Sequence, residues 1–167
     1  MKNYILFLFI LFTSISLKAQ DEEITTYYFI RHAEKVRTDS SNKNPNLTEK
    51  GKERAENWST VLKHIDFDLI YATNYNRTIQ TASPTAKNNN LELQFYDPRA
   101  LFNDEFKTKT KGKTVLIVGH SNTTPQFVNK ILGIEKYKDI EDTNNANLYI
   151  ITIANSKAID ILLKIKH

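Results

Sequence analysis

Short runs of β-branched, aliphatic and aromatic residues recur along the chain and predict strands. The first four of these runs cover residues 25–30, 67–73, 91–96 and 113–120. The run 113–120 has a continuous aliphatic centre, which is typical of a strand buried on both faces of a largely parallel sheet. Two further runs, 145–154 and 158–166, are separated only by a short polar segment, and they predict a hairpin at the edge of the sheet.

Three segments between these runs have the spacing and end signals of helices. Residues 48–64 begin with the cap residue Thr48, and their apolar side chains recur at helical spacing, although Gly51 lowers the helix propensity. Residues 74–90 predict a second helix, which Pro84 should kink or interrupt. Residues 121–133 start with capping side chains and stop at a glycine, so they predict a third helix.

Strands that alternate with helices predict a three-layer α/β fold, in which helices flank a mostly parallel central sheet. The hydrophobic content of 40% and the charged content of 25% fit a single domain, which we assign to residues 20–167. Ligand sites in such folds form at the carboxyl ends of the strands. Two predicted strands end in Arg31–His32 and Gly119–His120, so we expect both histidines at one edge of the sheet.

Residues 1–19 have the features of a secretory signal peptide. Lys2 precedes the unbroken apolar stretch 4–12, and Ala19 is a small residue at a suitable cleavage point. The stretch is short for a spanning helix, which needs roughly 20 residues, but an uncleaved anchor is the alternative interpretation. We therefore expect an exported protein, periplasmic or secreted, with no stable membrane insertion after cleavage, and the absence of cysteine permits an oxidising compartment.

The charge pattern argues against nucleic acid as a partner. The formal net charge is +4, but two of the basic residues, Lys2 and Lys18, belong to the leader. The other basic residues are spread along the chain without interleaved aromatic side chains, so a solvated surface is the simpler interpretation. Histidines and carboxylates show no metal-ligand spacing, and we expect neither a metal nor another cofactor.

Four motifs carry the chemistry: "RHAEK" at 31–35, "LTEKGKERA" at 47–55, "YATNYNRTIQTA" at 71–82 and "VGHSN" at 118–122. In their order and spacing they resemble the histidine phosphatase superfamily, which includes phosphoglycerate mutases and short SixA-like phosphohistidine phosphatases. The resemblance implies a metal-independent phosphatase that hydrolyses phosphate monoesters or phosphohistidine on a phosphorylated small molecule or phosphoprotein. The chain lacks the large insertion that would enclose a mutase site, so we do not expect a mutase.

The resemblance also implies roles for four residues. His32 is the expected nucleophile, which forms a covalent phosphohistidine, and Arg31, Arg77 and His120 match the phosphate pocket. Guanidinium groups and an imidazole are suited to the charge that spreads over the oxygens of a transferring phosphoryl group. Ala33 stands where the family commonly has glycine, which is a modest departure.

Other candidate residues have competing interpretations. Asp104 or Glu105 is the expected general acid, because the family places an acid in this part of the chain. Ser121 and Asn122 either add anion affinity at a helix start or simply cap the helix. Lys35 either attracts anionic substrates or lies in a solvated loop.

One further function of the same fold competes with catalysis. A phospho-ligand-binding protein of the same fold would keep the arginines without turnover, although it would not need the two histidines. Each site residue, taken alone, also has a structural interpretation as an ion-pair partner or a helix cap.

Overall fold

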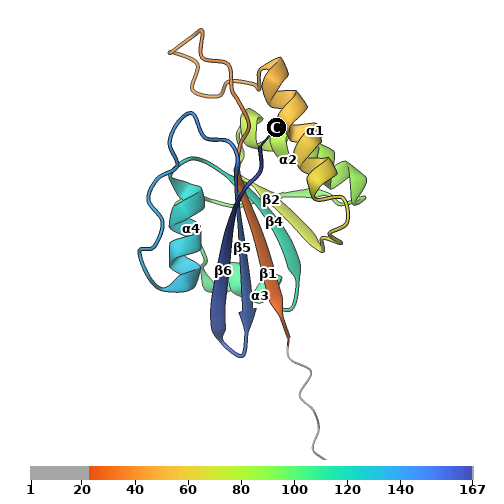
Figure 1. Cartoon of the computed structure of the whole chain (residues 1–167), viewed down its shortest axis with the longest axis vertical. Coiled ribbons are helices and arrows are strands. Elements are labelled where there is room, and N and C mark those ends of the chain that lie inside the picture. The colour runs from red at the N-terminus through yellow and green to blue at the C-terminus, as the bar shows by residue number, and fades with distance from the viewer. Residues whose placement is uncertain (1–22, 167) are drawn as a thin grey trace, which may run out of the picture.

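A six-stranded sheet in the order β3-β2-β4-β1-β5-β6 forms the centre of the molecule in the computed structural model, which describes residues 23–166 (Figure 1). The strands are β1 (Thr25–Arg31), β2 (Leu69–Ala72), β3 (Leu93–Phe95), β4 (Thr114–Gly119), β5 (Asn147–Ala154) and β6 (Lys157–Lys164). Neighbouring strands from β3 to β1 pair in parallel, and β5 and β6 form an antiparallel hairpin beside β1. The predicted mostly parallel sheet with a C-terminal edge hairpin is confirmed.

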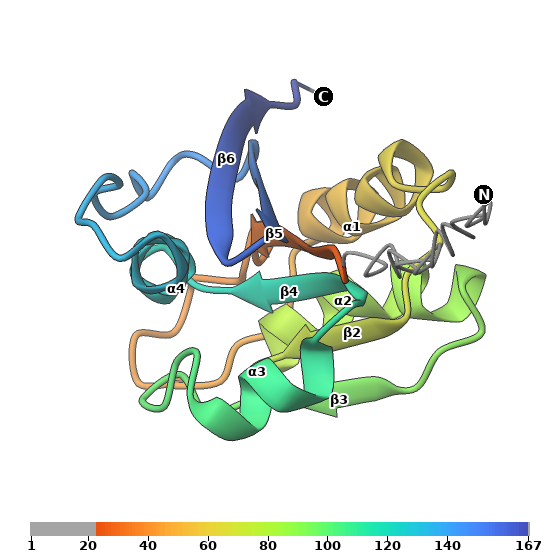
Figure 2. The same ribbon diagram turned by 90° about the horizontal axis from the view of Figure 1, so that it is seen from below.

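Helices cover both faces of the sheet and create two separate hydrophobic cores (Figure 2). On one face, α1 (Glu49–Val61) and α2 (Asn76–Asn88) contribute Trp58 and Ala82 to a core against Ile30 and Leu116. On the other face, α3 (Asp104–Thr110) and α4 (Thr123–Leu132) contribute Phe106 and Phe127. The three-layer prediction is therefore confirmed.

The start of α1 fits closely against the chain that follows β1. Thr48 caps the helix as predicted, because its hydroxyl accepts a hydrogen bond from the backbone of Gly51 at 3.0 Å. A Cβ atom at Gly51 would stand only 2.2 Å from the carbonyl oxygen of Glu34. Glycine is thus required here by close packing, which outweighs its low helix propensity.

Two details of the helices differ from the sequence predictions. The helix α2 continues through Pro84 without interruption, so the proline does not break it. The seven-residue α3 was not predicted, because only Phe106 and Thr110 are buried and they give too little periodicity. Its signals are local ones, the cap of Asn103 on the backbone N–H of Phe106 at 2.8 Å and acidic residues in the first turn.

The predicted signal peptide, residues 1–19, lies outside the described residues. Within residues 23–166, no helix is both long and apolar enough to cross a membrane.

Candidate active site

The carboxyl ends of β1 and β4 lie side by side and carry the two motif histidines. Arg31 is in register with Gly119, and the backbone N–H of His32 donates to the carbonyl of Gly119 at 2.9 Å. The rings of His32 and His120 have centroids 5.5 Å apart and meet edge to face. Two strand ends therefore bring both imidazoles to one cavity of about 330 Å³.

The local backbone sets the tautomer of His32. Its Nδ1 lies 2.7 Å from the carbonyl oxygen of Ala33, which can only accept, so Nδ1 carries the proton and Nε2 keeps its lone pair. The ring is buried, with 4% of the residue exposed. Burial, reinforced by the neighbouring cations Arg31 and Arg77, lowers the pKa of His32 to about 3. The imidazole of His32 is thus uncharged at neutral pH.

Hydrogen bonds on both sides hold the backbone around His32. The side chain of Asn145 donates to the carbonyl of His32 at 2.8 Å, and the N–H of Ala33 donates to the hydroxyl of Thr81 at 2.9 Å. That hydroxyl in turn donates to the carbonyl of Arg77 at 2.6 Å. The backbone after His32 and that of Arg77 are therefore linked through Thr81 of α2, and Ala33 is fully buried.

Arg31 is a buried cation held by the loop that precedes β5. Its Nη1 donates to the backbone carbonyls of Glu141, Asp142 and Asn144 at 2.9, 2.9 and 3.1 Å. Its Nη2 donates to the Asp142 carboxylate at 2.8 Å. The Nε–H is buried and has no hydrogen-bond partner among the described residues. Such a donor is costly unless a ligand satisfies it.

Arg77 also lines the cavity, and like Arg31 it combines contacts of its guanidinium group with a buried Nε–H that has no partner among the described residues. Its guanidinium lies over the ring of Tyr75, 4.5 Å from the centroid, and Nη1 reaches the carbonyl of Lys43 at 3.5 Å. The Nε–H is again buried and unpaired among the described residues. Arg31 and Arg77 therefore both line the cavity that His32 lines, and each has a buried Nε–H without a partner among the described residues.

A chain of hydroxyl groups orients His120. Its Nε2 lies 2.9 Å from the Thr73 hydroxyl, which lies 3.0 Å from the Thr78 hydroxyl, and Thr78 is 2.7 Å from the carbonyl of Thr73. Because the carbonyl only accepts, Thr78 donates to it, Thr73 donates to Thr78, and His120 Nε2–H donates to Thr73. Burial and the cations Arg77, Lys35 and Arg31 lower the pKa of His120 to about 4, so the free ring is neutral at pH 7.

Most of the sequence-predicted residues line this cavity. Besides His32, Arg31, Arg77 and His120, it is lined by Lys35, Ser121 and Asn122. Asn122 precedes α4 without a side-chain cap hydrogen bond, so its amide is not used as a cap.

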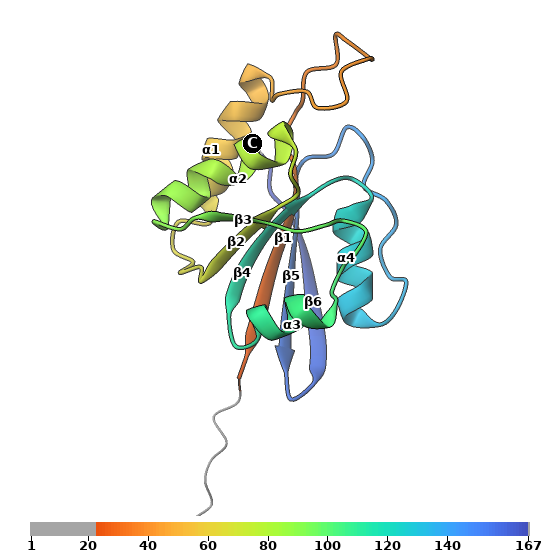
Figure 3. The same cartoon turned by 180° about the vertical axis from the view of Figure 1, so that it is seen from behind.

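The structure does not bring Asp104 or Glu105 to the cavity. Both residues begin α3, which precedes β4 and so lies at the end of the sheet opposite the site (Figure 3). Asp104 pairs with Lys107, and Glu105 pairs with Lys109. The expectation that either carboxylate is the general acid therefore has no geometric basis.

Residues that sequence reasoning missed complete the site. Asp142 lines the cavity and binds both Arg31 and Arg37, while Thr73 supports His120 and Asn145 supports His32. The only available signal was position, because Thr73 ends the predicted strand 67–73 and Asn145 opens the predicted strand 145–154. Among residues 23–166, no group of three or more histidines or carboxylates could hold a metal ion.

Comparisons with known proteins agree with this geometry. Residues 27–98 match the family described as "Histidine phosphatase superfamily (branch 1)". No curated protein sequence matches the chain at a significant level. The matched segment covers less than half of the chain and contains three of the four motifs, those at 31–35, 47–55 and 71–82.

Three solved structures illustrate the shared fold. Phosphoglycerate mutase from Bacillus anthracis str. Sterne has a TM-score of 0.65 and 18% identity, covering 86% of this chain and 94% of that one. The α-ribazole phosphatase from Shigella flexneri has a TM-score of 0.64 and 16% identity, covering 85% and 98%. The protein histidine phosphatase SixA complexed with tungstate has a TM-score of 0.65 and 12% identity, covering 83% and 96%. The chain has the phosphoglycerate mutase-like fold.

Proposed function

We propose that the protein is a metal-independent phosphatase that works through a covalent phosphohistidine on His32. The observation that carries this proposal is the free Nε2 of a buried, neutral His32 in a cavity that the guanidinium-bearing residues Arg31 and Arg77 also line. The fold neighbours include enzymes described as phosphatases, and one holds tungstate, a tetrahedral oxyanion. These relatives support the same chemistry here.

The first step is an in-line displacement at phosphorus. The Nε2 lone pair of His32 forms the N–P bond, and the bond from phosphorus to the leaving oxygen breaks. Arg31 and Arg77 donate to the equatorial oxygens, whose charge is greatest in the transition state. The substrate dianion favours a proton on Nδ1 of His120, which lets this ring donate to phosphate while Nε2–H stays on Thr73. Water then attacks phosphorus, releasing phosphate and restoring His32.

The carboxylates that line the cavity favour substrates whose leaving groups have low basicity. Asp142 is the one carboxylate among the described residues that line the cavity. Hydrogen bonds from Arg37 and Arg31 lower the pKa of Asp142, so it stays ionised and is a poor proton donor. Phosphohistidine and aryl phosphates need little protonation on departure, whereas alkyl phosphates need a general acid. We therefore propose substrates of the first kind.

Turnover of an aryl phosphate tests the proposed function. We expect the protein without its leader to hydrolyse p-nitrophenyl phosphate, to keep that activity after dialysis against EDTA, and to be far slower on an alkyl phosphate. Activity that disappears with EDTA and returns with a divalent metal would contradict the metal-independent mechanism. Tight phosphate binding without turnover would favour the alternative, a phospho-ligand-binding protein.

The leader-like residues 1–19 support one further part of the proposal. We propose that the protein is exported and acts in the periplasm or outside the cell on a phosphorylated small molecule or phosphoprotein.

A further inference from the structure

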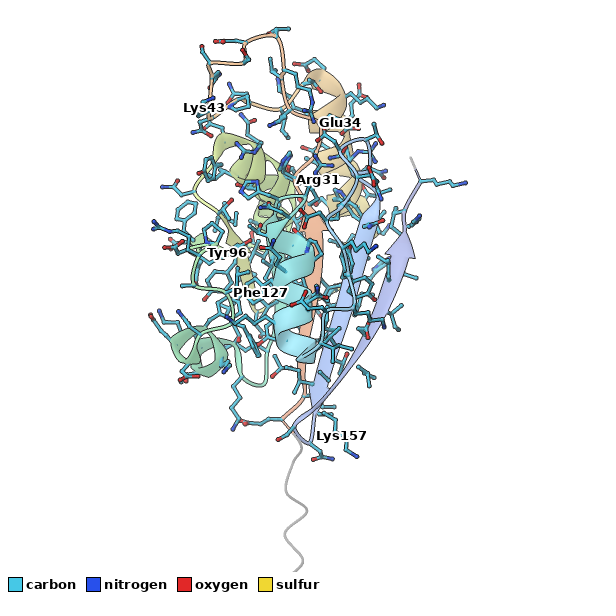
Figure 4. All side chains as sticks on the ribbon, turned by 90° about the vertical axis from the view of Figure 1, so that its left-hand side faces the viewer. Arg31, Glu34, Lys43, Tyr96, Phe127 and Lys157 are labelled. Atoms are coloured by element: carbon cyan, nitrogen blue, oxygen red, sulfur yellow. The ribbon has the colours of Figure 1, made fainter. Side chains whose placement is uncertain are left out.

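A second cavity of about 270 Å³ opens beside the one that holds the phosphoryl group. The two cavities share Arg31, His32, Lys35 and Asp142 in their walls. Arg37 and Lys50 contribute to the second cavity only. The two spaces are therefore parts of one larger basic surface, at the end of the sheet where Figure 4 labels Arg31 and Glu34.

The carboxylates in this second cavity are already neutralised by guanidinium groups. Glu34 accepts three hydrogen bonds of 2.8 to 3.0 Å from Arg54, which lies under it on α1. Asp142 accepts from Arg31 and Arg37, both at 2.8 Å. Neither acid is free to balance another cation fully, so the remaining positive charge of this surface has no matched counter-charge.

Lys35 carries that unmatched charge. Its ammonium group makes no hydrogen bond and no ion pair with the described residues, and the nearby Asp142 is shared by two arginines. The backbone of Lys35 is fixed by a β-bridge to Leu47, and its side chain is partly buried. A positioned cation of this kind is suited to a bound anion, whereas a lysine in a solvated loop would be free to move.

We propose that Lys35 and the second cavity bind another anionic group of the substrate, a carboxylate or a second phosphate, while the reacting phosphoryl group occupies the first cavity. This inference rests on the proposed phosphatase function. It makes Lys35 a determinant of specificity, because it selects phosphorylated compounds that carry a further negative charge on the leaving group.

A matched pair of substrates isolates the second charge. Carboxyphenyl phosphates and the corresponding carbamoylphenyl phosphates have similar shapes, and the ortho, meta and para isomers sample different distances from phosphorus. We expect wild-type kcat/KM to favour the carboxylate of at least one isomer by about tenfold, as a charge-assisted contact allows. Lys35→Met should remove that preference and Lys35→Arg should retain it. The carboxylate-to-carbamoyl ratio of kcat/KM is compared between variants. The two leaving groups differ in basicity by the same amount in every variant, so this difference cancels in the comparison.

Control measurements separate the possible failures. Lys157→Met removes an exposed lysine at the start of β6 and should leave the carboxylate-to-carbamoyl ratio of kcat/KM unchanged. Raised ionic strength should reduce this ratio in the wild type, because salt screens the charge of Lys35. A carboxylate-to-carbamoyl ratio that is the same in the wild type and Lys35→Met overturns the inference while the phosphatase function stands. Equal losses on both substrates in Lys35→Met would assign Lys35 to the reacting phosphoryl group and also overturn it. If the wild type hydrolyses neither substrate, the proposed function itself has failed.

Discussion

A neighbouring carbonyl and a buried environment act on the same ring of His32 and suit it to the proposed role of nucleophile. The Ala33 carbonyl fixes the proton on Nδ1, and burial keeps the ring uncharged. His120 is held in a comparable way by the hydroxyl of Thr73. Single hydrogen bonds at these two rings therefore decide which nitrogen faces the substrate.

Thr73→Val tests the hydroxyl chain behind His120. Valine keeps the shape of threonine but cannot accept from Nε2–H, so His120 loses its fixed tautomer. We expect kcat/KM for an aryl phosphate to fall about tenfold, as for loss of one hydrogen bond to a charged group, with a shifted pH profile. Thr73→Ser should restore both. An unchanged pH profile in Thr73→Val would show that the threonine has only a packing role.

The buried histidines also predict the dependence of stability on pH. In the unfolded chain a histidine takes up a proton near pH 6.5, but folded His32 does so only at about pH 3. Acid therefore favours the unfolded state across this interval, and His32 alone should cost about 2 kcal/mol of unfolding free energy at pH 5 relative to pH 7. Denaturant titrations at pH 7 and pH 5 should show a smaller loss of unfolding free energy in His32→Gln than in the wild type. Equal losses in both proteins would contradict the buried, neutral imidazole.

At the scale of elements, α1 fits closely against the chain after β1, which carries His32. Gly51→Ala would place a methyl group 2.2 Å from the Glu34 carbonyl, two residues beyond His32. We expect a loss of about 2 kcal/mol in unfolding free energy, as for overpacking, together with lower activity. Glu53→Ala, at an exposed position of the same helix, should change stability by at most about 0.5 kcal/mol. A Gly51→Ala protein as stable as the wild type would show that the contact relaxes easily.

The elements also explain which features the sequence could predict. The strand positions followed from hydrophobic runs. The placement of both histidines at one edge followed from the residues that end two of these runs, because the carboxyl ends of parallel strands share an edge. The acid at Asp104 or Glu105 was placed from position along the chain alone. That reasoning fails because a segment leading into β4 lies at the amino end of the strand, away from the site. Thr73 and Asp142 were missed because their roles depend on tertiary contacts.

At the scale of the whole molecule, the proposed export rests on residues outside the described structure. We predict that the exported protein starts at Gln20 or Asp21, because the apolar stretch ends well before Ala19. The intact mass of protein purified from a secreting host measures this directly. A mature protein that keeps Met1 and sediments with membranes would indicate an anchor instead.

The proposed mechanism requires a covalent phosphohistidine on His32. Rapid acid-free quenching during turnover of a labelled aryl phosphate detects this intermediate directly. We expect a phosphoenzyme that is stable in base and labile in acid, with the phosphoryl group on His32. It should be absent from His32→Ala and present in His64→Ala, which removes an exposed histidine outside the site. Full turnover by His32→Ala, or a phosphoryl group trapped on another residue, would contradict the account.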